Sequence, residues 1–356
     1  MSLLRVHGLD LSYFTGKLEA YLRAKGLPYE LVEMDTRSFR RCAQITGVAQ
    51  MPQLELPDGQ WLTDSTPIIA HLEGLAPGPA IYPEAPALCF IAHLLEDFGD
   101  EWLWRPAMHY RWSFAPDARR ASERLARGLL RDVPLPLAWR RWLIRQRQQR
   151  RFLRKDGVDR QTAPAVEQVY LDVLDAMQSC LSSQEFLLGK RPTQADFGLF
   201  GSMFRHFASD PTPARIMQAR APAVLAWVNR LWHLTPQQFS GQPLPATLPV
   251  DLAPLLRLVC EDYLPYLDCN ERALAAGARR LSWQSKGVTF NTPVHRYRLC
   301  CLQQLRQHYQ ALSREARERV DGWLQSSSVD LGFFAVSLLQ RAAGAPLQAT
   351  ETAYRP

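Results

Sequence analysis

Two polar residues, Asp64 and Ser65, stand where a predicted helix begins, a position that suits the binding of an anion. Residues 65–73 are predicted to be helical, with Thr66-Pro67 in the first turn. Free backbone N–H groups and the positive end of the helix dipole favour a carboxylate at such a position. Ser65 also suits a plain helix N-cap, and the two roles are compatible.

The elements that must position these residues alternate between strand and helix over the first 75 residues. Gly26 and Pro28 end the first helix, and Pro57-Asp-Gly59 predicts a hairpin turn. From residue 88 onward, long segments with helical periodicity dominate. A small α/β domain therefore precedes a helical one, with a proline-rich linker over 77–86. The predicted strands are 3–7, 29–34, 53–56 and 60–63, and the predicted helices are 12–25, 38–46, 65–73, 88–100, 166–181, 197–207 and 221–234.

Four segments match a known family in order and spacing: 12–29, Met51-Pro52-Gln-Leu54, 62–72 and 186–196. With them, this arrangement resembles the glutathione transferase superfamily, in which a thioredoxin-like domain is followed by a helical domain. The resemblance covers residues 1–80 and 165–235, and it says little about 105–160 or 240–356. In the helical part, Thr193-x-x-Asp196 fits the start of a buried helix, and we assign it to folding.

The resemblance implies a glutathione site in the first domain. The bond before Pro52 is expected to be cis, which exposes the backbone of Met51 for pairing with an extended peptide such as glutathione. The Ser65 hydroxyl and backbone N–H are expected to hold the γ-glutamyl carboxylate, and Asp64 its ammonium group. Gln50 falls where some family members contact glutathione.

Thiol activation is the chemistry that the resemblance implies. Only the thiolate attacks electrophiles, and a free thiol has a pKa of ~8.5, so a hydroxyl donor at a helix start must lower it. By the family register Thr15 occupies the activating position, and Ser12 and Tyr13 are neighbouring alternatives. No cysteine stands there, and Cys42 is interpreted as a small buried hydrophobe in the next helix. A thiol oxidoreductase is therefore disfavoured.

Composition excludes several other classes. A chain of 356 residues with 47% hydrophobic and 22% charged residues builds packed cores rather than a disordered chain. The seven cysteines show no CxxC or Cys/His pairing, so we expect no metal site and no disulfide scaffold. No signal peptide and no membrane-spanning run is visible, which predicts a cytoplasmic protein.

The positive charge is concentrated in one apparent insert. Residues 111–160 hold 15 of the Lys and Arg residues but only 5 Asp and Glu. Within them, 137–155 predicts a basic amphipathic helix with Trp139 and Trp142 on one face, which suits anionic lipid or phosphate. A solvated helix face is the commoner explanation, and we expect no nucleic-acid partner. The aromatic stretch 102–112 is interpreted either as helix core or as the wall of a pocket for an apolar substrate.

The predicted domains are 1–78, 86–240 with the insert at about 111–160, and 245–356. In the last, helices are expected over 252–274, 297–312 and 331–339, with an extended stretch at 281–291. This extension carries no catalytic pattern, and covering the active site, extending a dimer interface and binding a partner remain open roles.

The expected fold class is a thioredoxin-like α/β domain followed by an all-α glutathione-transferase-type domain with a helical extension. The leading hypothesis is a detoxification enzyme that transfers glutathione, its co-substrate, to a small electrophilic molecule. The alternative is a glutathione-fold binding or scaffold protein without catalysis. A homodimer is compatible with either reading.

Overall fold

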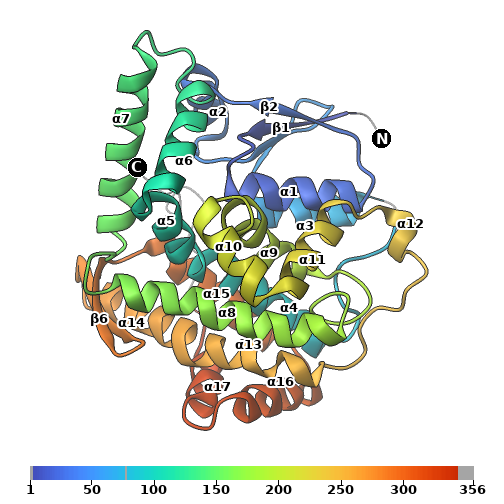
Figure 1. Ribbon diagram of the computed structural model, residues 1–356. Coiled ribbons are helices and arrows are strands. Elements are labelled where there is room, and N and C mark those ends of the chain that lie inside the picture. The colour runs from blue at the N-terminus through green and yellow to red at the C-terminus, as the bar shows by residue number, and fades with distance from the viewer. Residues whose placement is uncertain (1–2, 77, 344–356) are drawn as a thin grey trace.

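The first domain is a thioredoxin-like α/β unit, seen in the computed structural model that describes residues 3–76 and 78–343 (Figure 1). Its elements are β1 (Leu4–Gly8), α1 (Tyr13–Ala24), β2 (Tyr29–Glu33), α2 (Thr36–Thr46), β3 (Gln53–Glu55), β4 (Trp61–Thr63) and α3 (Ser65–Leu75). The sheet has the order β2-β1-β3-β4, with β1 and β2 parallel and the other pairs antiparallel. The seven predicted elements of this domain are confirmed in their predicted order.

Local sequence explains where these helices begin and end. The Ser12 side chain accepts a hydrogen bond from the Thr15 N–H and so caps α1. Asp35 and Ser38 form a reciprocal capping box at the start of α2. Gly47 ends α2 in the left-handed conformation, with φ of 76°, which glycine adopts without a steric penalty. Ser12 and Asp64, at the starts of α1 and α3, both line the cavity described below.

The second domain is all helical, with α9 at its centre. Every residue of α9 is buried, and α9 packs against both α4 and α1. Its Thr193–Asp196 capping box is present as predicted, so the assignment of this motif to folding is confirmed. The domain consists of α4 (Pro86–Asp97), the π-helical turn η1 (Phe98–Trp102), α5 (Trp104–Ser113), α6 (Ala115–Arg127), α7 (Leu137–Gln148), the π-helical turn η2 (Gln149–Arg154), α8 (Ala163–Ser183), α9 (Gln194–Ser202), η3 (Met203–Phe207), α10 (Pro211–Arg220), α11 (Pro222–Trp232) and α12 (Pro236–Phe239).

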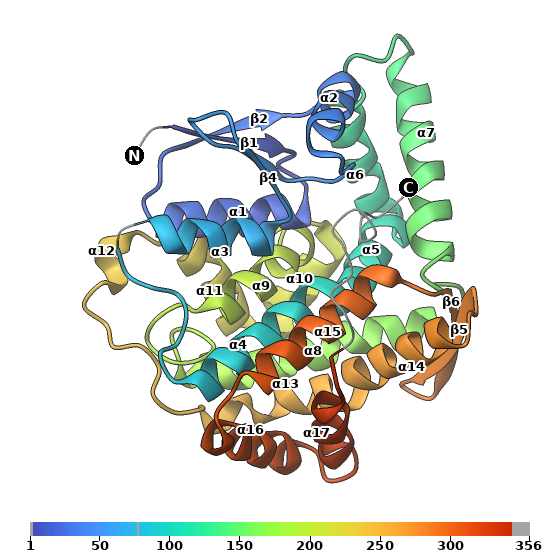
Figure 2. The same ribbon diagram turned by 180° about the vertical axis from the view of Figure 1, so that it is seen from behind.

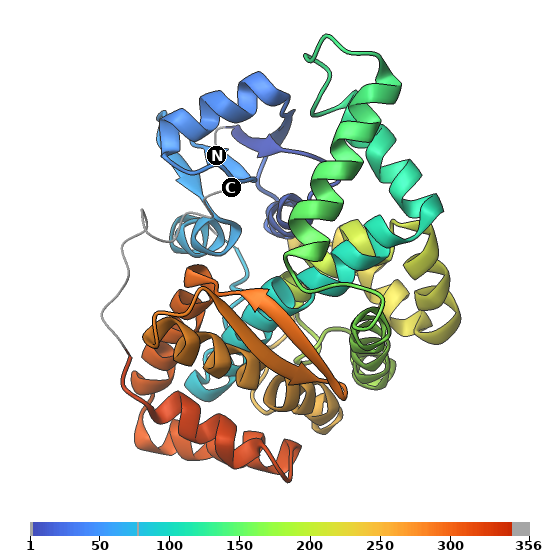
Figure 3. The same cartoon turned by 90° about the vertical axis from the view of Figure 1, so that its left-hand side faces the viewer.

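The basic insert forms a helical hairpin. Helices α6 and α7 pack against each other, and the hairpin, green in Figure 3, stands beside the thioredoxin-like domain. The predicted basic helix over 137–155 is confirmed as α7, which runs on into η2. The insert therefore belongs to the helical domain and lies alongside the thioredoxin-like domain.

The extension packs on the helical domain rather than standing apart. Helices α15 and α16 lie against α4 (Figure 2). The helix predicted over 252–274 is interrupted by η5, the extended stretch at 281–291 is a β-hairpin, and α16 was not predicted. The elements are η4 (Val250–Leu252), α13 (Ala253–Leu258), η5 (Val259–Tyr263), α14 (Leu264–Ala275), β5 (Arg280–Ser285), β6 (Val288–Pro293), α15 (Arg296–Gln310), α16 (Arg314–Ser327) and α17 (Gly332–Gln340).

Two parts of the predicted organisation lie outside the described residues, namely residue 77 of the linker and residues 344–356 of the extension. The domain boundaries given above stay predictions. Among the helices that the structure describes, none is long and apolar enough to cross a membrane.

Candidate functional site

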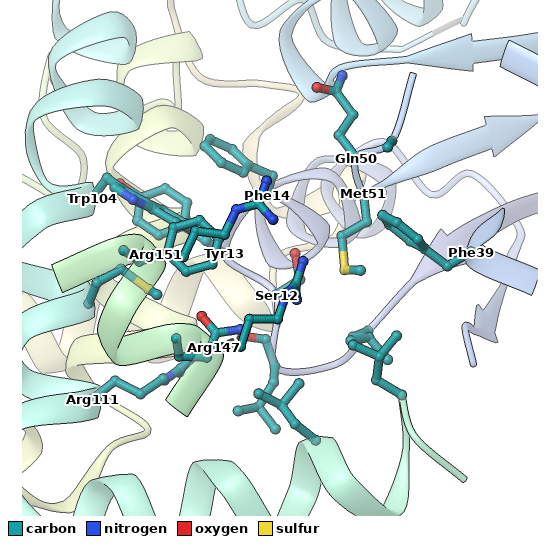
Figure 4. A pocket seen from close by; sticks show the side chains of 18 of the residues that line it. Ser12, Tyr13, Phe14, Phe39, Gln50, Met51, Trp104, Arg111, Arg147 and Arg151 are labelled. Atoms are coloured by element: carbon teal, nitrogen blue, oxygen red, sulfur yellow. Dashed lines mark hydrogen bonds between the residues drawn. The ribbon is translucent and has the colours of Figure 1, made fainter. Parts of the chain in front are cut away.

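A cavity of about 670 Å³ lies between the thioredoxin-like domain and the helical domain, and residues of the extension also line it. Pockets that take small molecules commonly measure ~300–1,000 Å³. Figure 4 shows Gln50 and Met51 on one side of this cavity and Trp104, Arg111 and Arg147 on the other. The cavity thus brings together residues that lie far apart in the sequence.

Three of the predicted site residues lie in the segment that leads into β3, next to the cavity. The Met51–Pro52 peptide bond is cis, as predicted. Gln50, Met51 and Pro52 all line the cavity. The side-chain amide of Gln53 donates to the carbonyls of Val48 and Gln50, at 2.8 and 3.1 Å, and so holds this segment against β3.

Asp64 and Ser65 line the same cavity at the start of α3. Asp64 caps the helix through a 3.3 Å hydrogen bond from the Thr66 N–H. Ser65 is 1% exposed, and its hydroxyl has no hydrogen-bond partner among the described residues. A buried polar group without a partner costs stability. Since it lies at the cavity, this hydroxyl is available to a ligand.

Ser12 is one of the two predicted alternatives to Thr15, and it lines the cavity. It is half-buried and stands just before α1, with an extended backbone at φ of −76° and ψ of 132°. Its oxygen receives only a long hydrogen bond, 3.4 Å from the Thr15 nitrogen. The hydroxyl proton is therefore free for a ligand, at the positive end of a helix.

Thr15, the residue that the family register selected, does not line the cavity. It is completely buried, and its hydroxyl has no hydrogen-bond partner among the described residues. A side-chain carbon added to Gly8 would lie 2.5 Å from that hydroxyl oxygen, so Thr15 faces β1. Its place in the first turn of α1 explains the difference, because that face of the turn packs on the sheet. The structure thus separates Thr15 from Ser12 and Ser65.

Tyr13 borders the cavity but its hydroxyl is engaged elsewhere. The hydroxyl donates to the carbonyl of Gly99 in η1. Burial, with a further contribution from Asp100, raises the pKa of Tyr13 well above its usual value. The Tyr13 ring packs against Phe14, Trp104 and His206. Tyr13 therefore joins the two domains.

An ion cluster that sequence reasoning missed lies beneath the cavity. Lys17 is fully buried, and its ammonium contacts Glu96 at 2.6 Å, Asp100 at 2.5 Å and the Thr66 hydroxyl at 2.8 Å. Burial alone would lower the pKa of Lys17, but the carboxylates of Asp100 and Glu96 more than offset it and raise the pKa. The cluster ties α1 and α3 to α4 and η1, which fixes the relative position of the cavity's two sides.

The extension also supplies residues to the cavity, which no pattern in its sequence indicated. The Tyr297 hydroxyl donates to Asp64 Oδ2 at 2.8 Å. Burial, followed by the charge of Asp64, raises the pKa of Tyr297 and keeps it a donor. Arg298 pairs with Glu101 at 3.1 Å. Of the roles left open for the extension, covering the site is the one that these contacts support.

The other side of the cavity is largely apolar. Trp104 and Trp112 line it, whereas Trp102 packs against Tyr263 and Trp283, so the stretch 102–112 serves both as pocket wall and as core. The α6–α7 hairpin adds leucine, isoleucine and valine side chains: Leu125, Leu129, Leu130, Val133, Leu143 and Ile144. Arg147 and Arg151 line the cavity as well, so the solvated-face interpretation of the segment 137–155 is incomplete.

Comparisons with known proteins are consistent with this architecture. Residues 6–80 match the family model of the glutathione S-transferase N-terminal domain, and residues 158–230 match that of the C-terminal domain. No curated protein matches the sequence. Similar solved structures include the beta-etherase LigF from Sphingobium sp. strain SYK-6 (20% identity, TM-score 0.46, 64% of this chain and 94% of that chain). Another is a GST-like protein from Pseudomonas syringae (19% identity, TM-score 0.46, 70% of this chain and 78% of that chain). A third is glutathione transferase F7 from Populus trichocarpa (18% identity, TM-score 0.42, 64% of this chain and 92% of that chain).

The two family domains occur in the expected order. The first covers nearly all of the thioredoxin-like unit, and the second covers the later helices of the helical unit. Residues 6–80 contain β2, β3, β4 and most of β1, and residues 158–230 contain α8, α9, α10 and most of α11. The chain therefore belongs to the glutathione transferase superfamily.

Proposed function

We propose that the protein is a cytoplasmic glutathione transferase that activates the glutathione thiol for attack on a small electrophilic molecule. The observation that carries this proposal is one cavity that joins Ser12, at the start of α1, to Asp64 and Ser65, at the start of α3, and to an apolar opposite wall. A polar peptide on one side and an apolar electrophile on the other match this division.

The polar side suits glutathione group by group. Ser65 and the start of α3 are proposed to bind the γ-glutamyl carboxylate, because the unpartnered hydroxyl and the helix N-terminus both favour an anion. Asp64 is proposed to pair with the ammonium group. Gln50 and Arg40, which line the cavity near α2, are proposed to hold the glycyl carboxylate. Nothing in the sequence distinguished Arg40 from Arg37 and Arg41 of the same helix.

Ser12 is proposed to activate the thiol. Its hydroxyl donates to the sulfur, and the start of α1 adds a positive potential, so both lower the thiol pKa. The thiol proton passes to water, and the thiolate attacks an electrophilic carbon. A carbon–sulfur bond forms, and the leaving group departs with the electrons of the bond that breaks. No metal takes part in this scheme.

Ser65→Ala is expected to weaken glutathione binding about 10- to 150-fold, since a hydrogen bond to a charged group contributes ~1.5–3 kcal/mol. Isothermal titration calorimetry measures this affinity directly. The same change should leave the free energy of unfolding unchanged or raise it, because it removes a buried hydroxyl that has no partner in the protein.

Ser122→Ala is the matched control for this experiment. Ser122 is also buried, but its hydroxyl donates to the Arg119 carbonyl within α6. It should lose stability and keep its glutathione affinity. Equal affinity of the Ser65→Ala variant and the parent would contradict the proposed carboxylate site.

Tyr297→Phe is expected to weaken glutathione binding about fivefold, as the loss of one neutral hydrogen-bond donor contributes ~1 kcal/mol. The physical reason is that Tyr297 fixes the Asp64 carboxylate that is proposed to bind the ammonium group. Tyr309→Phe offers a control on the same helix, since its hydroxyl donates to Asp321 at 2.7 Å, away from the cavity. If both variants lose stability and neither loses affinity, the extension has only a structural role.

A further inference from the structure

The charge on the apolar side of the cavity is not balanced. Arg40 lines the polar side of the cavity, as described above. Of the arginines on the other sides, Arg111 is held by Asp210 at 2.7 Å and by the Leu11 carbonyl at 3.0 Å. Arg298 is held by Glu101. Arg147 and Arg151 differ from these, because no hydrogen bond or ion pair joins either of them to another of the residues that the structure describes.

The carboxylates that line the cavity are committed to other groups. Asp64 accepts from Tyr297, Asp100 from Lys17 and Glu101 from Arg298. Asp156 lies deeper in the wall, buried and near Arg105 and Arg298. None of these pairs with Arg147 or Arg151, so the wall formed by α7 and η2 keeps two positive charges without an anion.

Arg147 and Arg151 line the same cavity from one helical segment. Arg147 and Arg151 are four residues apart along a continuous helical segment, which places them on one face. Figure 4 shows both of them among the side chains around Ser12, Tyr13 and Phe14. Like charges at this spacing repel one another, and an anion bound between them would relieve the repulsion.

We propose that the second substrate is an amphipathic organic anion: an apolar, aromatic body lies between Trp104, Trp112 and Ile144, and its carboxylate or sulfonate binds Arg147 and Arg151. This inference rests on the proposed function and narrows its electrophile to one chemical class. The apolar wall sets the shape of the body, and the arginine pair selects for negative charge. Arg147 is exposed and Arg151 is half-buried, so salt should weaken the attraction.

A binding experiment tests the inference without relying on catalysis. The fluorescence of 8-anilinonaphthalene-1-sulfonate and of its uncharged analogue N-phenyl-1-naphthylamine reports binding of an anionic and a neutral apolar probe. In the Arg147→Gln/Arg151→Gln variant, the affinity for the sulfonate should fall at least about tenfold, as expected for the loss of charge-assisted hydrogen bonds. The affinity for the neutral probe should stay within about twofold of the parent value, since the apolar wall is unchanged.

The control variant is Arg145→Gln/Arg150→Gln, which removes the same charge from the same segment at exposed positions that do not line the cavity. It should bind both probes as the parent does. Equal losses in the two double variants, or equal losses for the two probes, would overturn the inference, because the effect would then come from net charge or from the apolar wall.

Turnover of 4-chloro-3-nitrobenzoate and of its methyl ester, with glutathione, supplies the catalytic arm. The methyl ester is intrinsically the more reactive electrophile, so the readout is the carboxylate-to-ester ratio of kcat/KM, which should be at least about tenfold lower in Arg147→Gln/Arg151→Gln than in the parent. If the parent turns over neither of these compounds nor a generic aryl halide, the proposed function fails, while the fluorescence experiment still decides whether the arginine pair binds anions.

Discussion

Replacing Ser12 with alanine is expected to lower the turnover of a generic aryl halide about a hundredfold, the usual effect of removing one well-placed hydrogen-bond donor to a developing or bound anion. The bound thiol would lose its donor, so its pKa would rise and less thiolate would form at neutral pH. The ultraviolet absorbance of the thiolate, followed against pH in the glutathione complex, measures that pKa independently of the rate. Glutathione affinity, set mainly by the proposed Asp64 and Ser65 contacts, should change little.

Two further variants separate chemistry from folding. Ser12 also caps α1, and alanine at a cap costs ~0.5–2 kcal/mol, whereas glycine costs only a few tenths of a kcal/mol. Ser12→Gly should therefore keep the stability of the parent and show the same loss of rate. Thr15→Val should leave the rate and the thiol pKa unchanged, because Thr15 is buried against β1 and outside the cavity.

The opposite pattern would assign the activating role to Thr15: in that case Thr15→Val would lower the turnover of the aryl halide, and Ser12→Ala would leave it at the parent value. If the parent forms no thiolate at neutral pH, then a binding or scaffold protein becomes the better description. The measured thiol pKa decides both between Ser12 and Thr15 and between an enzyme and a binding protein. It depends on the site and not on the choice of electrophile.

The thioredoxin-like domain could be predicted because its signals are local. Alternating residues at 29–34, the hairpin turn at 57–59 and the glycine and proline after the first helix each specify one element through nearby residues. The position of the site near Met51–Pro52 and Asp64-Ser65 was implied by the resemblance of these segments to the glutathione transferase superfamily. These residues do line one cavity.

The choice between Thr15 and Ser12 could not be made in this way. Both are hydroxyl residues near a helix start, and their sequence positions differ by less than one turn. The structure separates them because Ser12 has an extended backbone outside the helix, whereas Thr15 lies in the first turn and faces Gly8. Which face of the turn meets the sheet depends on tertiary packing.

The residues that the extension and the insert supply to the cavity could not be predicted for a related reason. Tyr297 and Asp64 are 233 positions apart in the sequence, and no local pattern reports such a contact. In the insert, the alternation of arginine with apolar residues predicts an amphipathic helix, but it does not say what the helix faces. In the structure, part of that face meets the cavity, and arginines that a surface interpretation treats as solvated become candidates for ligand binding.

Replacing Lys17 with methionine is expected to lower the free energy of unfolding by ~3–5 kcal/mol, because a buried charge that loses its partner costs about that much. Methionine keeps the length of the side chain, so the effect comes from the carboxylates of Glu96 and Asp100, which would lose their contacts at 2.6 and 2.5 Å. Urea denaturation followed by circular dichroism measures the change. Since Lys17 joins the two domains, both should lose stability together.

The pH dependence of this loss identifies its origin. Burial already raises the pKa of Asp100, and without Lys17 it would rise further above the ~4 of an unfolded chain, so the folded protein would take up a proton there as the pH falls. The loss in the Lys17→Met variant should therefore be largest near pH 8 and smaller near pH 5. Adding Glu96→Gln should restore part of the stability, because it removes one of the uncompensated charges. A loss below about 1 kcal/mol that is independent of pH would mean that the cluster contributes packing rather than charge pairing.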